Sequence, residues 1–160
     1  MRCRHWLGLI AGLSLSAAPL IASAQDEPSV ERGRYLVQIG GCNDCHTAGY
    51  AEAGGDIPEE EWLKGDILGF RGPWGTTYPM NLRLRFAELT EDAWVEYAKT
   101  FVTRPPMPWF NIRAMTETDV RSLHRYVTSF ENKGEKAPDF VPPEQEPPPP
   151  FIQWPAPPPQ

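Results

Sequence analysis

The chain has 160 residues, of which 19 are proline, and carries a formal net charge of −6. An acidic chain is poorly suited to bind nucleic acid or an anionic membrane, so we expect neither as a partner. This length predicts one small domain with a limited apolar core.

Residues 1–24 have the features of a secretory signal peptide. Two arginines precede an apolar run over residues 7–21, and small residues follow at the cleavage site. Polar residues interrupt the apolar run, which is also short for a membrane span. We therefore expect cleavage, export to the periplasm and no membrane span in the mature chain. Cleavage would also remove Cys3 and leave Cys42 and Cys45 as the remaining thiols.

The first expected helix of the mature chain runs from Val30 to about Ile39. Ser29 is a suitable N-cap, and the two glycines after Ile39 end the helix. Gly33 leaves a notch in the apolar surface of this helix, or it is a tolerated helix glycine that costs about 1 kcal/mol relative to alanine.

The sequence Cys42-Asn43-Asp44-Cys45-His46 follows this helix directly. Two cysteines three positions apart, followed at once by histidine, form the attachment signature of a c-type haem. One tight turn can present both sulfurs to the haem, and the adjacent imidazole can then bind the iron as an axial ligand. A disulfide redox motif, a structural bridge and half of a zinc site are the alternatives. His46 and the lack of further cysteines favour haem.

Residues 49–65 form a polar loop with acidic residues at 56 and 59–61. We expect a solvated insertion and disfavour cation binding, because the ligand pattern of an EF-hand is missing. The next stretch, 72–82, is rich in turn formers and aromatic residues. Nearby cations are candidates to pair with the carboxylates of a haem, or are solvated surface groups; they are Arg71, Arg83 and Arg85.

Two more helices are expected, one beginning after Thr90 and the last beginning after Thr116. Between them, prolines on both sides pin the backbone of Met107, which suits the presentation of a thioether better than the filling of a core. Met80 also follows a proline in a loop and is the serious rival as second iron ligand. Met115 and His124 are weaker candidates because both are expected to pack in or beside helices.

Prolines dominate the sequence from residue 136 to residue 160. This composition predicts a disordered, polyproline-type tail without a core of its own, outside a domain that spans residues 28–135. Phe151, Ile152 and Trp154 could form a docking patch on this tail, or the tail could be inert.

The run Gly33-Arg34-Tyr35-Leu36, followed by residues 41–48, resembles a single-haem class I c-type cytochrome domain. Residues 72–82 and the run Pro105-Pro106-Met107-Pro108-Trp109 resemble the haem domains of cytochrome subunits that serve periplasmic alcohol and sugar dehydrogenases. The resemblance covers residues 31–131. It implies an all-α, cytochrome c-like fold with three main helices and long loops around one covalently attached haem c.

The resemblance also implies roles for individual residues. Met107 would be the distal iron ligand opposite His46. Trp74 and Tyr78 would pack on the macrocycle, and Tyr126 would pack across Gly33.

These features predict an electron carrier rather than an enzyme, because two strong ligands leave no open position on the iron. We expect redox proteins as partners: a dehydrogenase, an oxidase or another cytochrome. The alternative is a peroxidase-like haem enzyme or a gas sensor, in which Met107 does not bind and the distal site stays open. The resembled subunits usually carry three haem motifs, whereas this chain has one.

Overall fold

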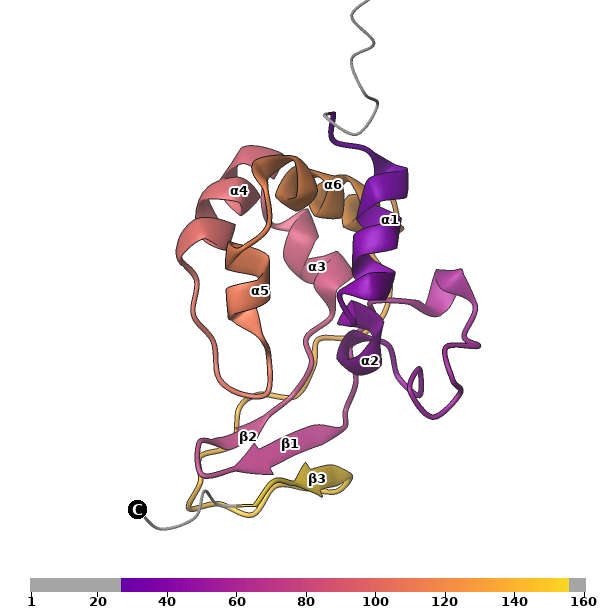
Figure 1. Cartoon of the computed structure of the whole chain (residues 1–160). Coiled ribbons are helices and arrows are strands. Elements are labelled where there is room, and N and C mark those ends of the chain that lie inside the picture. The colour runs from indigo at the N-terminus through magenta and orange to yellow at the C-terminus, as the bar shows by residue number, and fades with distance from the viewer. Residues whose placement is uncertain (1–26, 156–160) are drawn as a thin grey trace, which may run out of the picture.

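The computed structural model describes residues 27–155 (Figure 1). The expected signal peptide, 1–24, lies outside the described residues. The helices are α1 (Val30–Ile39), α2 (Cys42–His46), η1 (Glu59–Glu61, a 3-10 turn), α3 (Leu82–Ala87), α4 (Glu91–Thr100), α5 (Trp109–Arg113) and α6 (Glu117–Thr128). The strands are β1 (Gly69–Gly72), β2 (Gly75–Thr77) and β3 (Phe151–Gln153). Within residues 27–155, no helix is both long and apolar enough to cross a membrane.

The three longest helices, α1, α4 and α6, are the three that the sequence predicts. Each begins after the expected capping residue: Ser29, Thr90 or Thr116. In each case the hydroxyl oxygen accepts a hydrogen bond from the backbone N–H three residues later, at 3.0–3.2 Å. The local capping chemistry therefore sets where these helices begin.

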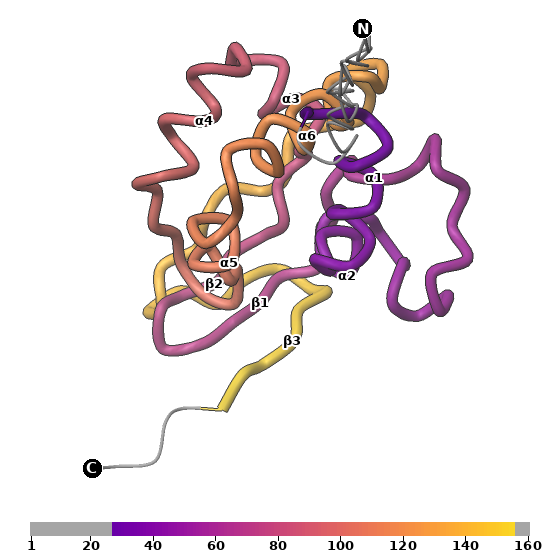
Figure 2. Tube along the Cα trace, turned by 45° about the horizontal axis from the view of Figure 1, so that its top comes forward, coloured from indigo at the N-terminus to yellow at the C-terminus, as the bar shows by residue number. Residues whose placement is uncertain are grey.

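Helix α1 crosses α6 at close range, and the two lie side by side in both views (Figures 1 and 2). A Cβ atom at Gly33 would lie 2.1 Å from the carbonyl oxygen of Ser122 and 2.5 Å from the Cβ of Tyr126. Glycine is required here because the two backbones approach too closely for a larger residue. The expected packing of Tyr126 across Gly33 is confirmed.

The core lies between α1, α4 and α6, and it also takes in Trp62 and Leu63 from the long loop. Both side chains are buried, although the sequence predicts a solvated loop here. Tyr126 Oη donates to Glu59 Oε1 at 2.8 Å and holds the same loop against α6. The expected insertion is thus exposed over residues 51–54 and 60–61, whereas Trp62 and Leu63 anchor its C-terminal end in the core.

The fold is mainly helical but not all-α, so this prediction is confirmed only in part. Strands β1 and β2 form an antiparallel hairpin, and β3 pairs parallel to β1 in the register Gly69↔Phe151, Phe70↔Ile152 and Arg71↔Gln153. Strands of three or four residues are too short for an alternating pattern to show in the sequence. The second partner of β1, strand β3, also lies in the segment whose prolines predict a disordered tail.

The proline-rich tail lies along this hairpin as far as residue 155, which differs from the disordered tail that its composition predicts (Figure 1). Thr76 and Val141 exchange two backbone hydrogen bonds, at 2.8 and 3.1 Å. The Trp154 N–H donates to the carbonyl oxygen of Arg71 at 2.7 Å. Prolines keep the tail extended, and its non-proline residues supply the N–H groups that pair with the sheet edges.

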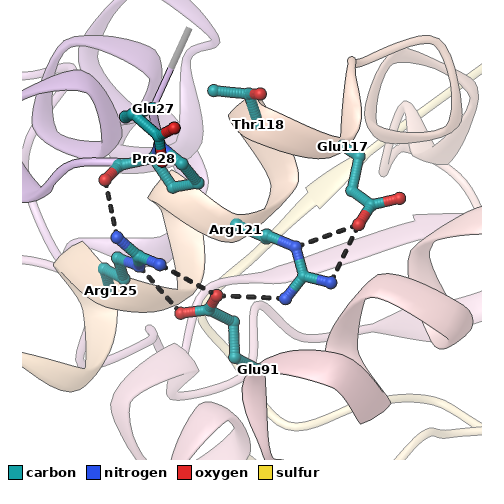
Figure 3. Close-up of a pocket in the computed structure, with 7 residues that line it drawn as sticks. All are labelled: Glu27, Pro28, Glu91, Glu117, Thr118, Arg121 and Arg125. Atoms are coloured by element: carbon teal, nitrogen blue, oxygen red, sulfur yellow. Dashed lines mark hydrogen bonds and ion pairs between the residues drawn. The ribbon is translucent and has the colours of Figure 1, made fainter.

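The N-terminal ends of α1, α4 and α6 meet around a surface hollow of about 380 Å³ (Figure 3). Arg125 donates to Glu91 at 2.9 Å and to the carbonyl oxygen of Pro28 at 2.7 Å. Arg121 bridges Glu91 and Glu117 at 3.1 and 2.8 Å. These arginines lower the pKa of Glu91. The two arginines therefore compensate the carboxylates at this hollow and link the N-terminal ends of the three helices.

Candidate functional site

A cavity of about 350 Å³ opens beside α2 and extends between the β1–β2 hairpin, α4 and α5. Its wall is mainly apolar. All four site residues that the sequence predicts line it: Cys42, Cys45, His46 and Met107. His46 and Met107 are 61 positions apart in the chain, so only the tertiary structure brings them to one cavity.

Helix α2 is the single turn that presents the two cysteines. Gly41 begins it in a left-handed conformation, at φ 66°, which lets the chain turn sharply between α1 and α2. Burial raises the pKa of Cys42 to about 11 and also raises the pKa of Cys45. Redox-active thiols of disulfide oxidoreductases have lowered pKa values instead, so these thiols have the opposite character.

His46 is buried, and its Nδ1 lies 2.8 Å from the carbonyl oxygen of Met80. A carbonyl oxygen can only accept a hydrogen bond, so Nδ1 carries the hydrogen and the lone pair is on Nε2. Burial lowers the pKa of His46, although this hydrogen bond partly opposes the shift. The ring is therefore neutral and oriented, as a metal-binding imidazole must be.

Two buried hydrogen bonds at Thr47 support α2. Thr47 Oγ1 donates to Asn43 Oδ1 and accepts from the Leu63 N–H, both at 2.8 Å. This ties the cysteine turn to the long loop. Asn43 and Thr47 are not among the site residues that the sequence predicts. The contact between Thr47 and Asn43 is local, but the hydrogen bond from the Leu63 N–H depends on where the long loop lies, which the sequence does not indicate.

Met80 and Met107 both line the cavity, but they are placed differently. The Met80 carbonyl faces Nδ1 of His46, so the Met80 backbone lies on the far side of the histidine from the lone pair of Nε2. Met80 is 47% exposed as a residue, whereas Met107 is partly buried against the core. Met115 also lines the cavity. His124 lies elsewhere, with its Nε2 at 2.8 Å from the carbonyl oxygen of Leu89.

The arginines expected beside a haem have different roles. Arg85 lines the cavity. Arg83 is buried and donates to the backbone carbonyls of Glu59, Glu60 and Trp62, and Arg71 pairs with a carboxylate of the tail. Arg104, which is not among the cations expected from the sequence, also lines the cavity. All three expected cations thus have other partners, since Arg85 also pairs with Glu88 at 2.9 Å, and a fourth arginine lies at the wall.

Four buried side-chain atoms lack a hydrogen-bond partner in the described part of the chain: Asn43 Nδ2, Trp74 Nε1, Thr76 Oγ1 and Tyr78 Oη. Tyr78 lines the cavity, and its buried, unpartnered hydroxyl is a candidate to donate to a carboxylate of a bound group. The apolar wall suits a macrocycle, the cysteine pair suits thioether attachment, and the neutral imidazole suits iron. The residues present therefore fit a haem. Among residues 27–155, no group of three or more His, Cys, Asp and Glu side chains is placed to hold a metal ion.

Comparison with known proteins points the same way. The chain is similar to the cytochrome c subunit of alcohol dehydrogenase (quinone) from Gluconacetobacter polyoxogenes and to its counterpart from Komagataeibacter europaeus. Each is 32% identical over 130 residues, which cover 72% of this chain and 25% of the relative. This similarity supports a cytochrome c-like haem domain. The chain spans about a quarter of the length of these relatives, and no family model or solved structure matches it.

Proposed function

We propose that this chain is a monohaem c-type cytochrome that transfers single electrons between proteins in the periplasm. One observation carries the proposal: both cysteines of the attachment signature, His46 and Met107 line a single apolar cavity. When bound, haem c supplies a one-electron iron couple. Similarity to the cytochrome c subunit of a quinone alcohol dehydrogenase supports the same class of function.

The chain contributes two kinds of binding group. The sulfurs of Cys42 and Cys45 hold the haem as thioethers, and their raised pKa values keep them as neutral thiols before attachment. His46 Nε2 would bind the iron of a haem, and the Met80 carbonyl on Nδ1 fixes the ring and raises its basicity. Met107 would supply the second protein ligand. A His/Met pair raises the reduction potential of the iron.

We infer a dehydrogenase as electron donor, because the similar proteins are named as subunits of one. An oxidase or another cytochrome would accept the electron. The acidic net charge favours a basic docking surface on at least one partner. Export by the expected signal peptide, residues 1–24, would place the protein in the periplasm.

Visible spectroscopy of protein matured in a periplasm tests the ligand assignment, with Met107→Ala and Met80→Ala as a matched pair of variants. We expect a low-spin wild type with the sulfur-to-iron band near the red end of the spectrum. Met107→Ala should lose that band, and Met80→Ala should keep it, because the backbone carbonyl that orients His46 survives the substitution. The intact mass should exceed that of the polypeptide by one haem.

Other results would contradict the proposal in distinguishable ways. A high-spin wild type would favour the haem enzyme or gas sensor with an open distal site. Loss of the band in Met80→Ala alone would make Met80 the ligand. A purified chain without haem and with a Cys42–Cys45 disulfide would favour thiol redox chemistry.

A further inference from the structure

The tail reaches the cavity through Pro138 and the aromatic residue Phe140. Phe140 lines the cavity, and the guanidinium carbon of Arg104 lies 3.9 Å from the centroid of its ring. Arg104 begins the run Arg104-Pro105-Pro106-Met107. The tail therefore contacts the same loop that presents the methionine, three residues before it.

The position of Phe140 is held by strand β2. Its neighbour Val141 exchanges two backbone hydrogen bonds with Thr76, and the Phe140 ring packs on the backbone of Gly75. The next residue of β2, Thr77, donates from Oγ1 to the carbonyl oxygen of Pro105 at 2.8 Å. Strand β2 thus binds the tail through Thr76 and binds the methionine loop, residues 101–108, through Thr77.

The methionine loop has few other supports. Between the end of α4 at Thr100 and the start of α5 at Trp109, residues 102–105 are exposed. Arg104 forms no ion pair with any residue of the described chain, so its stack on Phe140 is its main contact. A planar guanidinium over an aromatic face is a favourable geometry that a more compact cation reproduces poorly.

We propose that Arg104 and Phe140 are positioning residues that keep the Met107 thioether on the iron. Through this pair, the proline-rich tail holds the methionine loop in place. The inference rests on the proposed function, because it requires a haem ligated by Met107. It assigns the tail a role in ligation that its composition does not indicate.

The test uses full-length, haem-loaded protein and titrates imidazole, which competes with the thioether for the iron. The readout is the imidazole concentration that removes half of the sulfur-to-iron band. Phe140→Leu keeps an apolar side chain but removes the aromatic face, and Arg104→Gln removes the cation. We expect each to lower that concentration roughly two- to five-fold, as for loss of an exposed cation–π contact. Phe140→Tyr, which keeps the aromatic face, should restore the wild-type value.

The double variant and a control separate this contact from general loosening of the tail. Because both substitutions break the same contact, the double variant should shift the midpoint no further than either single variant. Phe151→Leu removes an aromatic ring from β3, away from the cavity, and should match wild type. Far-UV circular dichroism should show unchanged helix content in all variants.

Two results would overturn the inference while leaving the proposed function intact. One is a wild-type midpoint in Phe140→Leu, and the other is an equal shift in Phe151→Leu. If wild-type protein shows no sulfur-to-iron band at all, the ligation by Met107 fails, and the inference fails with it.

Discussion

Replacing Gly33 by alanine should weaken the crossing of α1 and α6. The new Cβ would lie 2.1 Å from the carbonyl oxygen of Ser122, a backbone atom that cannot rotate away. The helices must then separate, and overpacking of this kind costs up to about 3 kcal/mol. Alanine returns about 1 kcal/mol through its better helix propensity. The net expected loss in the free energy of unfolding is therefore about 2 kcal/mol.

Urea unfolding followed by far-UV circular dichroism measures this loss. With an m-value of about 1.5 kcal/mol/M, the midpoint should fall by about 1.3 M. Glu31→Ala on the exposed surface of α1 is the matched control and should change stability by about 0.5 kcal/mol or less. A Gly33→Ala midpoint equal to or above wild type would refute the reasoning, since it would mean that the helices are not in contact at Gly33.

Three further predictions concern other parts of the molecule. The arginines of α6 lower the pKa of Glu91 below its ordinary value of 4.5, so its stabilisation is present above that pH and is lost as pH falls through the lowered pKa. Glu91→Gln should therefore reduce the change in urea midpoint between pH 5 and pH 2, and an unchanged pH profile would contradict this. Thr47→Val should cost about 2–4 kcal/mol, because it leaves the Leu63 N–H and the Asn43 amide oxygen unpaired, and chemical denaturation would show it. Tyr78→Phe should leave the haem-free chain as stable or slightly more stable, because it removes a buried hydroxyl that has no partner there, but should cost the haem-loaded protein about 2 kcal/mol. Thermal unfolding of the haem-free and haem-loaded forms measures both effects. An equal change in stability in the two forms would exclude a hydrogen bond from Tyr78 to the cofactor.

The geometry of the site also explains why two methionines beside one cavity need not be equivalent. Met80 contributes through its backbone, since its carbonyl oxygen orients His46. Met107 follows a loop that is held from two sides, by Thr77 and by Phe140. A substitution that changes only the side chain separates these two roles.

Local chemistry in the sequence determined much of this protein. The hydroxyls of Ser29, Thr90 and Thr116 cap the helices that they were expected to cap, because a cap depends on atoms only three residues apart. The attachment signature is equally local, since one helical turn contains both cysteines and the histidine. Gly33 could be recognised as a notch because it interrupts an apolar helix surface, and the family resemblance supplied Tyr126 as its partner.

Only the tertiary structure decided the contacts between distant segments. Thr76 pairs with Val141, and Arg104 stacks on Phe140, although no periodicity or spacing links these positions. The short sheet, the buried Arg83 and the placement of the proline-rich tail were missed for the same reason. A backbone N–H or a guanidinium binds whichever acceptor or ring the fold brings near it, so the residue type alone does not specify that partner.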